Sequence, residues 1–171
     1  MDELTQYLKS NCYYDNILEI ILNKKITITK EHISNINIDC CNVNGINIIN
    51  LFEKYGYVFT NDDYIMLLKK NRFVIYFIPK DKQTNEICKI AVQQDGYILH
   101  HISEDNKTNE ICEIAVQKFG FALKYVPEDK KTIALCKIAV EKDIYALDFV
   151  PDDKKHLFVK NWNYQYLINH N

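Results

Sequence analysis

Apolar positions recur every 24 residues in the C-terminal half of the chain. The runs "ICKIAV", "ICEIAV" and "LCKIAV" begin at residues 87, 111 and 135. In each run the apolar side chains cover a wide arc of a helix rather than one narrow stripe. A helix of this kind packs on two sides, as it does between neighbours in a stack. The pattern therefore predicts one helix per copy, buried against the helices before and after it.

Polar and small residues mark the ends of each predicted helix. The residue three positions before each run is a threonine, whose hydroxyl can cap a helix by accepting hydrogen bonds from free backbone amides: Thr84, Thr108 and Thr132. Gly96 and Gly120 follow the run in the first two copies, and we expect them to end the helix with a positive φ. Ile144 occupies this position in the third copy and departs from the pattern.

A second, shorter apolar segment completes each copy. The segments "YILHHI", "FALKYV" and "YALDFV" begin at residues 97, 121 and 145, and Pro127 or Pro151 closes the second and third. Their spacing fits a short helix, but it also fits a strand, which would give a leucine-rich-repeat-like α/β solenoid. We favour the helix because Ala122 and Ala146 form strands poorly and because no asparagine ladder follows.

The repeat pattern extends upstream in weaker form. The segment "YIMLLKKNRFVIYFIPKDKQTNE" reads as a degenerate first copy, and residues 16–33 parallel residues 47–64 at an offset of 31. We predict an all-α fold, a helical-repeat solenoid of stacked short helix pairs, in one domain over residues 1–171. Within it we expect an N-terminal cap (1–15), two longer units (16–62), four 24-residue units (63–155) and a C-terminal cap (156–171).

Composition and charge narrow the classes of partner. The 171 residues carry a formal net charge of -2 and a single arginine, Arg72. Because nucleic-acid affinity depends on basic side chains that neutralise phosphates, this balance disfavours nucleic-acid binding. No apolar stretch is long enough to span a membrane, and the N-terminus lacks the order of a signal peptide. We therefore expect an intracellular protein that does not enter membranes.

Cysteine and histidine side chains can form metal or catalytic sites, but their spacing in this chain does not favour one. Cys88, Cys112 and Cys136 hold the same place in three copies and read as small buried apolar residues. Cys40-Cys41, near His32, lack the spacing and the further ligands of a zinc site. His100-His101 would diverge on a helix and could not easily bind one ion. We expect no catalytic, cofactor or metal site and therefore no enzymatic activity.

The repeat motif resembles a known family. The pattern I/L-C-x-I-A-V, then G-Y/F-A-L-x-x-V-P-E/D-D-x-K-x-T, is similar to a short repeat family of unknown function from giant amoebal viruses and some intracellular bacteria. Ser103 stands where that pattern has proline. The upstream "NIINLFEKYGYVFTNDDY" resembles ankyrin-like repeats of the same viruses. The resemblance implies a giant-virus helical-repeat protein that acts in the cytoplasm of a host cell, and it implies no catalytic residues.

Comparison of the copies separates positions that repeat from positions that vary. The apolar positions repeat, whereas two adjacent positions of the second segment differ in every copy: His100, His101, Lys124, Tyr125, Asp148 and Phe149. We take these six residues as candidates for partner binding, although most variable surface residues have no such role. The expected function is a scaffold that binds a host or viral protein. A self-assembling structural protein and an RNA-binding helical repeat are the alternatives.

Overall fold

The computed structural model describes residues 2–10, 14–36 and 48–158. The chain divides into two compact units, residues 1–82 and 83–171, which are considered separately below. Within the described residues every regular element is a helix and none is a strand, so the all-α prediction is confirmed and the leucine-rich-repeat-like alternative is not supported.

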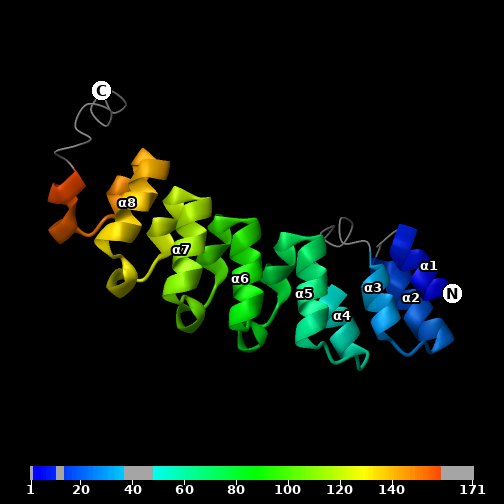
Figure 1. The fold of residues 1–171 in the computed structure, drawn as a ribbon. Coiled ribbons are helices and arrows are strands. Elements are labelled where there is room, and N and C mark those ends of the chain that lie inside the picture. The colour runs from blue at the N-terminus through cyan, green and yellow to red at the C-terminus, as the bar shows by residue number, and fades with distance from the viewer. Residues whose placement is uncertain (1, 11–13, 37–47, 159–171) are drawn as a thin grey trace. The chain divides into compact units, whose positions relative to one another are not determined.

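Three copies of one helix pair build the second unit (Figure 1). Each α-helix is followed by a six-residue 3₁₀-helix, in the chain order α6 (Asn85–Gln94), η4 (Gly96–His101), α7 (Asn109–Lys118), η6 (Gly120–Tyr125), α8 (Ile133–Lys142) and η8 (Ile144–Phe149). The turns η5 (Glu104–Asn106) and η7 (Glu128–Lys130) join successive pairs, and residues 152–158 are helical again. The predicted second element is thus a helix, wound more tightly than an α-helix.

The pairs stack in two layers. Helix α7 packs against α6 and α8 in one layer, while η6 packs against η4 and η8 in the other. The layers interlock because α7 also packs on η4, and α8 on η6. The equivalent leucines Leu99, Leu123 and Leu147 are all buried, as are the three cysteines of the α-helices. Each pair therefore buries its apolar side chains against its neighbours, which is the contact that defines a helical-repeat solenoid.

Side-chain caps fix where the helices of each pair begin. The hydroxyls of Thr84, Thr108 and Thr132 accept hydrogen bonds from the backbone amides three residues later, at 3.4, 3.3 and 3.2 Å, as predicted. Asp95 and Asp143 do the same for η4 and η8, each accepting from an amide two residues on at 3.0 Å. Short polar side chains thus start all three α-helices and two of the 3₁₀-helices, whereas η6 follows Phe119, which makes no side-chain cap.

The prediction that Gly96 and Gly120 adopt a positive φ is wrong. The one glycine with positive φ among the described residues is Gly56, with φ of 87°. A Cβ on Gly96 would instead lie 2.3 Å from the carbonyl oxygen of Ala115, and one on Gly120 2.6 Å from that of Ala139. These glycines are required because the next α-helix packs directly on the backbone. For Ile144 the sequence positions equivalent to these neighbours are 163 and 167, which lie outside the described part.

Helices of more varied length form the first unit. In chain order these are α1 (Glu3–Ser10), α2 (Tyr14–Lys24), α3 (Lys30–Asn35), α4 (Ile48–Lys54), α5 (Asn61–Lys70), η2 (Arg72–Phe77) and η3 (Lys80–Lys82). Helix α1 packs on α2 and α3, α3 on α5, and α5 on η2. The α5–η2 pair repeats the α-then-3₁₀ order of the second unit, as expected for a degenerate copy. Of the predicted C-terminal cap, residues 159–171 lie outside the described part.

Two buried polar networks hold the first unit together. The carboxylate of Asp63 accepts hydrogen bonds from the Thr60 amide (2.9 Å), the Thr60 hydroxyl (2.7 Å) and the Tyr57 hydroxyl (3.0 Å). Burial works against the charged form of Asp63, but the hydrogen bonds to Thr60 and Tyr57 outweigh it and lower its pKa. In the second network the Nε2 atom of His32 lies 2.8 Å from the Oδ2 atom of Asp2, and its Nδ1 atom accepts a hydrogen bond from the Thr29 amide at 2.9 Å.

Candidate protein-binding surface

All six predicted partner-binding residues lie on the 3₁₀ layer of the second unit. They fall in pairs at the ends of η4, η6 and η8. The first residue of each pair is exposed and the second is half-buried, so every one of them reaches the surface. The residues that vary between copies therefore share one layer of the stack, and the same 3₁₀-helices also carry the buried leucines of the core.

Aromatic rings join four of these six residues into a continuous row, which we name the aromatic ladder. It comprises Tyr97, His100, Phe121, Lys124, Tyr125 and Phe149. The Tyr97 ring contacts the rings of His100 and Tyr125, with centroids 4.4 and 5.7 Å apart. One repeat further on, Phe121 contacts Phe149 at 4.8 Å. Equivalent ring contacts are thus made across both junctions between the three 3₁₀-helices.

Lys124 lies at the centre of the ladder. Its ammonium is 5.8 Å from the centre of the Phe121 ring and 5.7 Å from those of Tyr125 and Phe149. Each distance is within the roughly 6 Å over which the negative face of a ring attracts a cation. His100 holds the equivalent position in the previous copy, 5.5 Å from the Tyr125 ring. A nitrogen-bearing side chain therefore sits between rings of two successive copies at both junctions.

The 3₁₀ geometry explains why these side chains meet. With three residues per turn, side chains at positions i and i+3 lie directly above one another, which aligns Tyr97 with His100 and Phe121 with Lys124. Stacking of the repeats then brings in the ring 28 residues after the first, Tyr125 or Phe149. Two effects raise the pKa of Tyr125. The larger is the removal of its hydroxyl from water within this cluster, and the smaller is a hydrogen bond with Tyr97.

The ladder and the six candidate residues overlap in part. Asp148 makes none of the ring contacts described for the ladder, and His101 adjoins the row through His100, with ring centroids 6.1 Å apart. Tyr97 and Phe121 belong to the ladder but were not among the candidates. Their signal was present, because the first residue of the second segment is aromatic in all three copies, Tyr145 being the third. Because this position is aromatic in every copy, it groups with the repeated apolar positions, although Tyr97 and Phe121 both reach the surface.

Two of the charged loops between repeats each contain one lysine that is buried rather than exposed to solvent. Stretches such as "EDKKT" read as solvent-facing, yet Lys107 and Lys131 are each only 5% exposed. Each ammonium pairs with a carboxylate three residues earlier, Lys107 with Glu104 at 2.6 Å and Lys131 with Glu128 at 2.5 Å. The aliphatic stem of the lysine packs into the stack, while its charged end remains paired at the surface.

No cluster of three or more histidine, cysteine, aspartate or glutamate side chains that could hold a metal occurs in the described parts of the chain. Cys88, Cys112 and Cys136 are buried thiols, as predicted. Burial raises the pKa of the Cys112 thiol to about 11, which keeps it protonated and unreactive at neutral pH. Cys40 and Cys41 lie outside the described residues.

Across the same described residues, every helix is too short or too polar to cross a lipid bilayer.

The fold and the ladder define a class: a tandem helical-repeat protein whose variable residues gather on one layer. The family model for the domain of unknown function DUF4116 matches residues 64–107 and 109–153. These matches cover more than half of the chain, so the protein belongs to the DUF4116 family. Each match spans two of the 24-residue copies. No curated protein and no solved structure is significantly similar to the chain.

Proposed function

We propose that the protein is a non-enzymatic scaffold that binds another protein through the aromatic ladder. In this proposal the chain is of giant-virus origin, acts in the host cytoplasm, and binds a host or viral protein. The viral origin rests on the resemblance of the repeat motif, and the ankyrin-like character of residues 16–62 rests on the weaker upstream resemblance.

The observation that carries the proposal is the accessible row of rings on the 3₁₀ layer. Tyrosine and phenylalanine offer large rigid contact areas, and protein interfaces are enriched in aromatic side chains for this reason. Burial in the core does not explain why this surface should be aromatic, since the side chain of Tyr97 is 43% exposed. The variation of His100, Lys124 and Asp148 among otherwise similar copies would supply selectivity along the same row.

The test compares proteins captured from host-cell extract by the wild-type chain and by the double variant Tyr125→Ala, Phe149→Ala. A partner that uses the ladder should be recovered about 30-fold less by the variant, which corresponds to loss of a contact worth about 2 kcal/mol. The matched control is Lys137→Ala, Glu141→Ala, which removes an exposed pair on α8. Circular dichroism should show that both variants keep their helices.

Recovery of the same partners by both variants would contradict the proposal. Light scattering distinguishes the self-assembling alternative: a mass that rises with concentration and falls to that of one chain in the Tyr125→Ala, Phe149→Ala variant would assign the ladder to self-association instead.

A further inference from the structure

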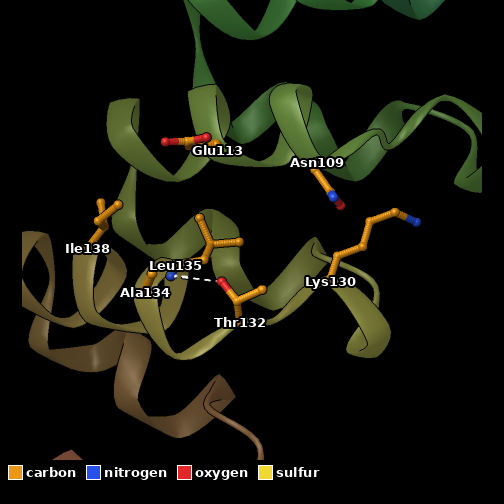
Figure 2. Close-up of a pocket in the computed structure, with 7 residues that line it drawn as sticks. All are labelled: Asn109, Glu113, Lys130, Thr132, Ala134, Leu135 and Ile138. Carbon is orange, nitrogen blue, oxygen red and sulfur yellow. Dashed lines mark hydrogen bonds between the residues drawn. The ribbon is translucent and has the colours of Figure 1, made fainter.

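A groove lies between α7 and α8, in the other layer of the second unit. Its volume is about 160 Å³, and Figure 2 shows the side chains that line it: Asn109, Glu113, Lys130, Thr132, Ala134, Leu135 and Ile138. Leu135 and Ile138 give it an apolar wall on α8. Glu113 on α7 faces this wall, while Asn109 and Lys130 lie toward the other end (Figure 2). The groove therefore combines an apolar wall with an accessible carboxylate.

The junction between α6 and α7 shows how the same stack treats the equivalent position. There Lys89 on α6 forms an ion pair with Glu110 on α7, 21 residues later. At the next junction the equivalent residues are Glu113 and Ala134. The alanine cannot reach across, so the ion pair between successive helices is lost and the groove stays open. The carboxylate of Glu113 is exposed and accepts a hydrogen bond from Gln117 on its own helix at 3.2 Å.

We propose that this groove binds a lysine or arginine side chain of a partner protein. The aliphatic stem would lie along Leu135 and Ile138, and the cationic end would pair with Glu113. This ion pair with the partner would correspond to the one that Lys89 and Glu110 form within the chain. Lys130 does not oppose this arrangement at the carboxylate, because it lies toward the far end and its ammonium is 3.6 Å from Asp129. The groove uses residues separate from the aromatic ladder, so the inference does not depend on the function proposed above.

The probe is the blocked amino acid Nα-acetyl-lysine-N-methylamide, titrated into the full-length chain and followed by ¹H–¹⁵N correlation spectra. We expect saturable shifts of the backbone amides of residues 109–113 and 132–138, with a dissociation constant on the order of millimolar for a single side chain. The arginine analogue should shift the same amides. The norleucine analogue has the stem without the charge, and it should bind several-fold more weakly.

Two variants separate the groove from general attraction to an acidic surface. Ala134→Lys should close the groove from within by pairing with Glu113, and should abolish the shifts caused by the probe. Glu113→Gln should keep the shape of the groove and weaken binding about threefold or more. The control Glu141→Gln removes a carboxylate elsewhere on α8 and should leave binding unchanged. Each variant should retain the wild-type circular dichroism spectrum, which shows that it folds.

Three results would overturn the inference. The first is an absence of shifts confined to the groove at probe concentrations up to tens of millimolar, an order-of-magnitude range for a site of this strength. The second is equal binding of the lysine and norleucine probes. The third is tighter binding of an aspartate analogue, which would assign the groove to an anionic side chain through Lys130.

Discussion

The two compact units of this chain are held together by different means. In residues 83–158 the same contacts recur from copy to copy: a threonine cap, a buried cysteine, a buried leucine and, twice, a glycine against the next helix. In residues 1–82 two polar networks, around Asp63 and around His32, supplement the apolar contacts, and each is built on a capping box, Thr60 with Asp63 and Thr29 with His32. The repeated unit obtains its stability from many similar apolar junctions, whereas the first unit also depends on individual charged groups.

This difference teaches how each unit can be probed. A substitution in the repeats has an internal control, because the equivalent residue in another copy has the same chemistry in a slightly different setting. A substitution in the Asp63 network removes a carboxylate whose pKa folding lowers, so its effect on stability should depend on pH. The predictions below use these two properties, from the largest expected effect to the smallest.

Leu123→Ala should lower the free energy of unfolding of the second unit by about 2–5 kcal/mol, because it leaves a cavity at a fully buried site that the middle copy shares with both neighbours. Urea denaturation followed by circular dichroism measures this change. Lys124→Ala is the matched control on the adjacent exposed residue and should change stability by less than about 1 kcal/mol. Equal stability of the two variants would show that Leu123 is not part of a shared core.

Gly120→Ala should destabilise the second unit by about 1–3 kcal/mol, because the new Cβ would lie 2.6 Å from the Ala139 carbonyl oxygen and α8 would have to move away. The backbone of Gly120 does not need a positive φ, so the penalty comes from this contact and not from strain in φ. Thermal unfolding measures this penalty, and Gly56→Ala is the comparison for strain in φ, because Gly56 has φ of 87° and an added Cβ there would meet no atom within 4 Å. A stabilised Gly120→Ala variant would show that the helices are not in such close contact.

Asp63→Asn should destabilise the first unit by about 1–3 kcal/mol at neutral pH, because it removes a buried charged acceptor from the Thr60 and Tyr57 donors. The pKa of Asp63 is lowered by folding, so its contribution is complete above the unfolded value near 4 and is lost as the pH falls through the lower folded value. The difference between wild type and variant should therefore shrink in acid. The exposed neighbour Asp62→Asn should show no such convergence.

Thr132→Ala should have the smallest effect, about 1 kcal/mol, because it removes only the side-chain acceptor for the Leu135 amide at the start of α8. The equivalent substitution Thr108→Ala should give a similar value, since its bond to Ile111 is nearly the same length. Urea denaturation of the two single variants tests this equality. A difference above about 1 kcal/mol between them would show that the copies are not energetically equivalent.

Much of the second unit could be predicted from the sequence because its signals are local and repeated. Thr84, Thr108 and Thr132 each accept a hydrogen bond from an amide only three residues later, and the three cysteines occupy the same position in each α-helix. Each pattern occurs three times, which makes it a stronger signal than a single copy would be. The variable positions of the second segment all lie on the 3₁₀ layer of the stack. The first unit repeats less regularly: the offset of 31 aligns Thr29 with Thr60 and His32 with Asp63, but nothing in that alignment signals that Tyr57 donates to Asp63 or that His32 lies against Asp2.

The sequence by itself determined the helical class, the repeat length and the starts of the α-helices, because caps and apolar periodicity depend on neighbouring residues. The tertiary structure decided why Gly96 and Gly120 are glycine, since their reason is a carbonyl oxygen on the following helix. It also decided that Tyr97 meets Tyr125 and that Lys124 lies among three rings. These contacts join residues of successive copies, and their geometry follows from how tightly the 3₁₀-helices stack.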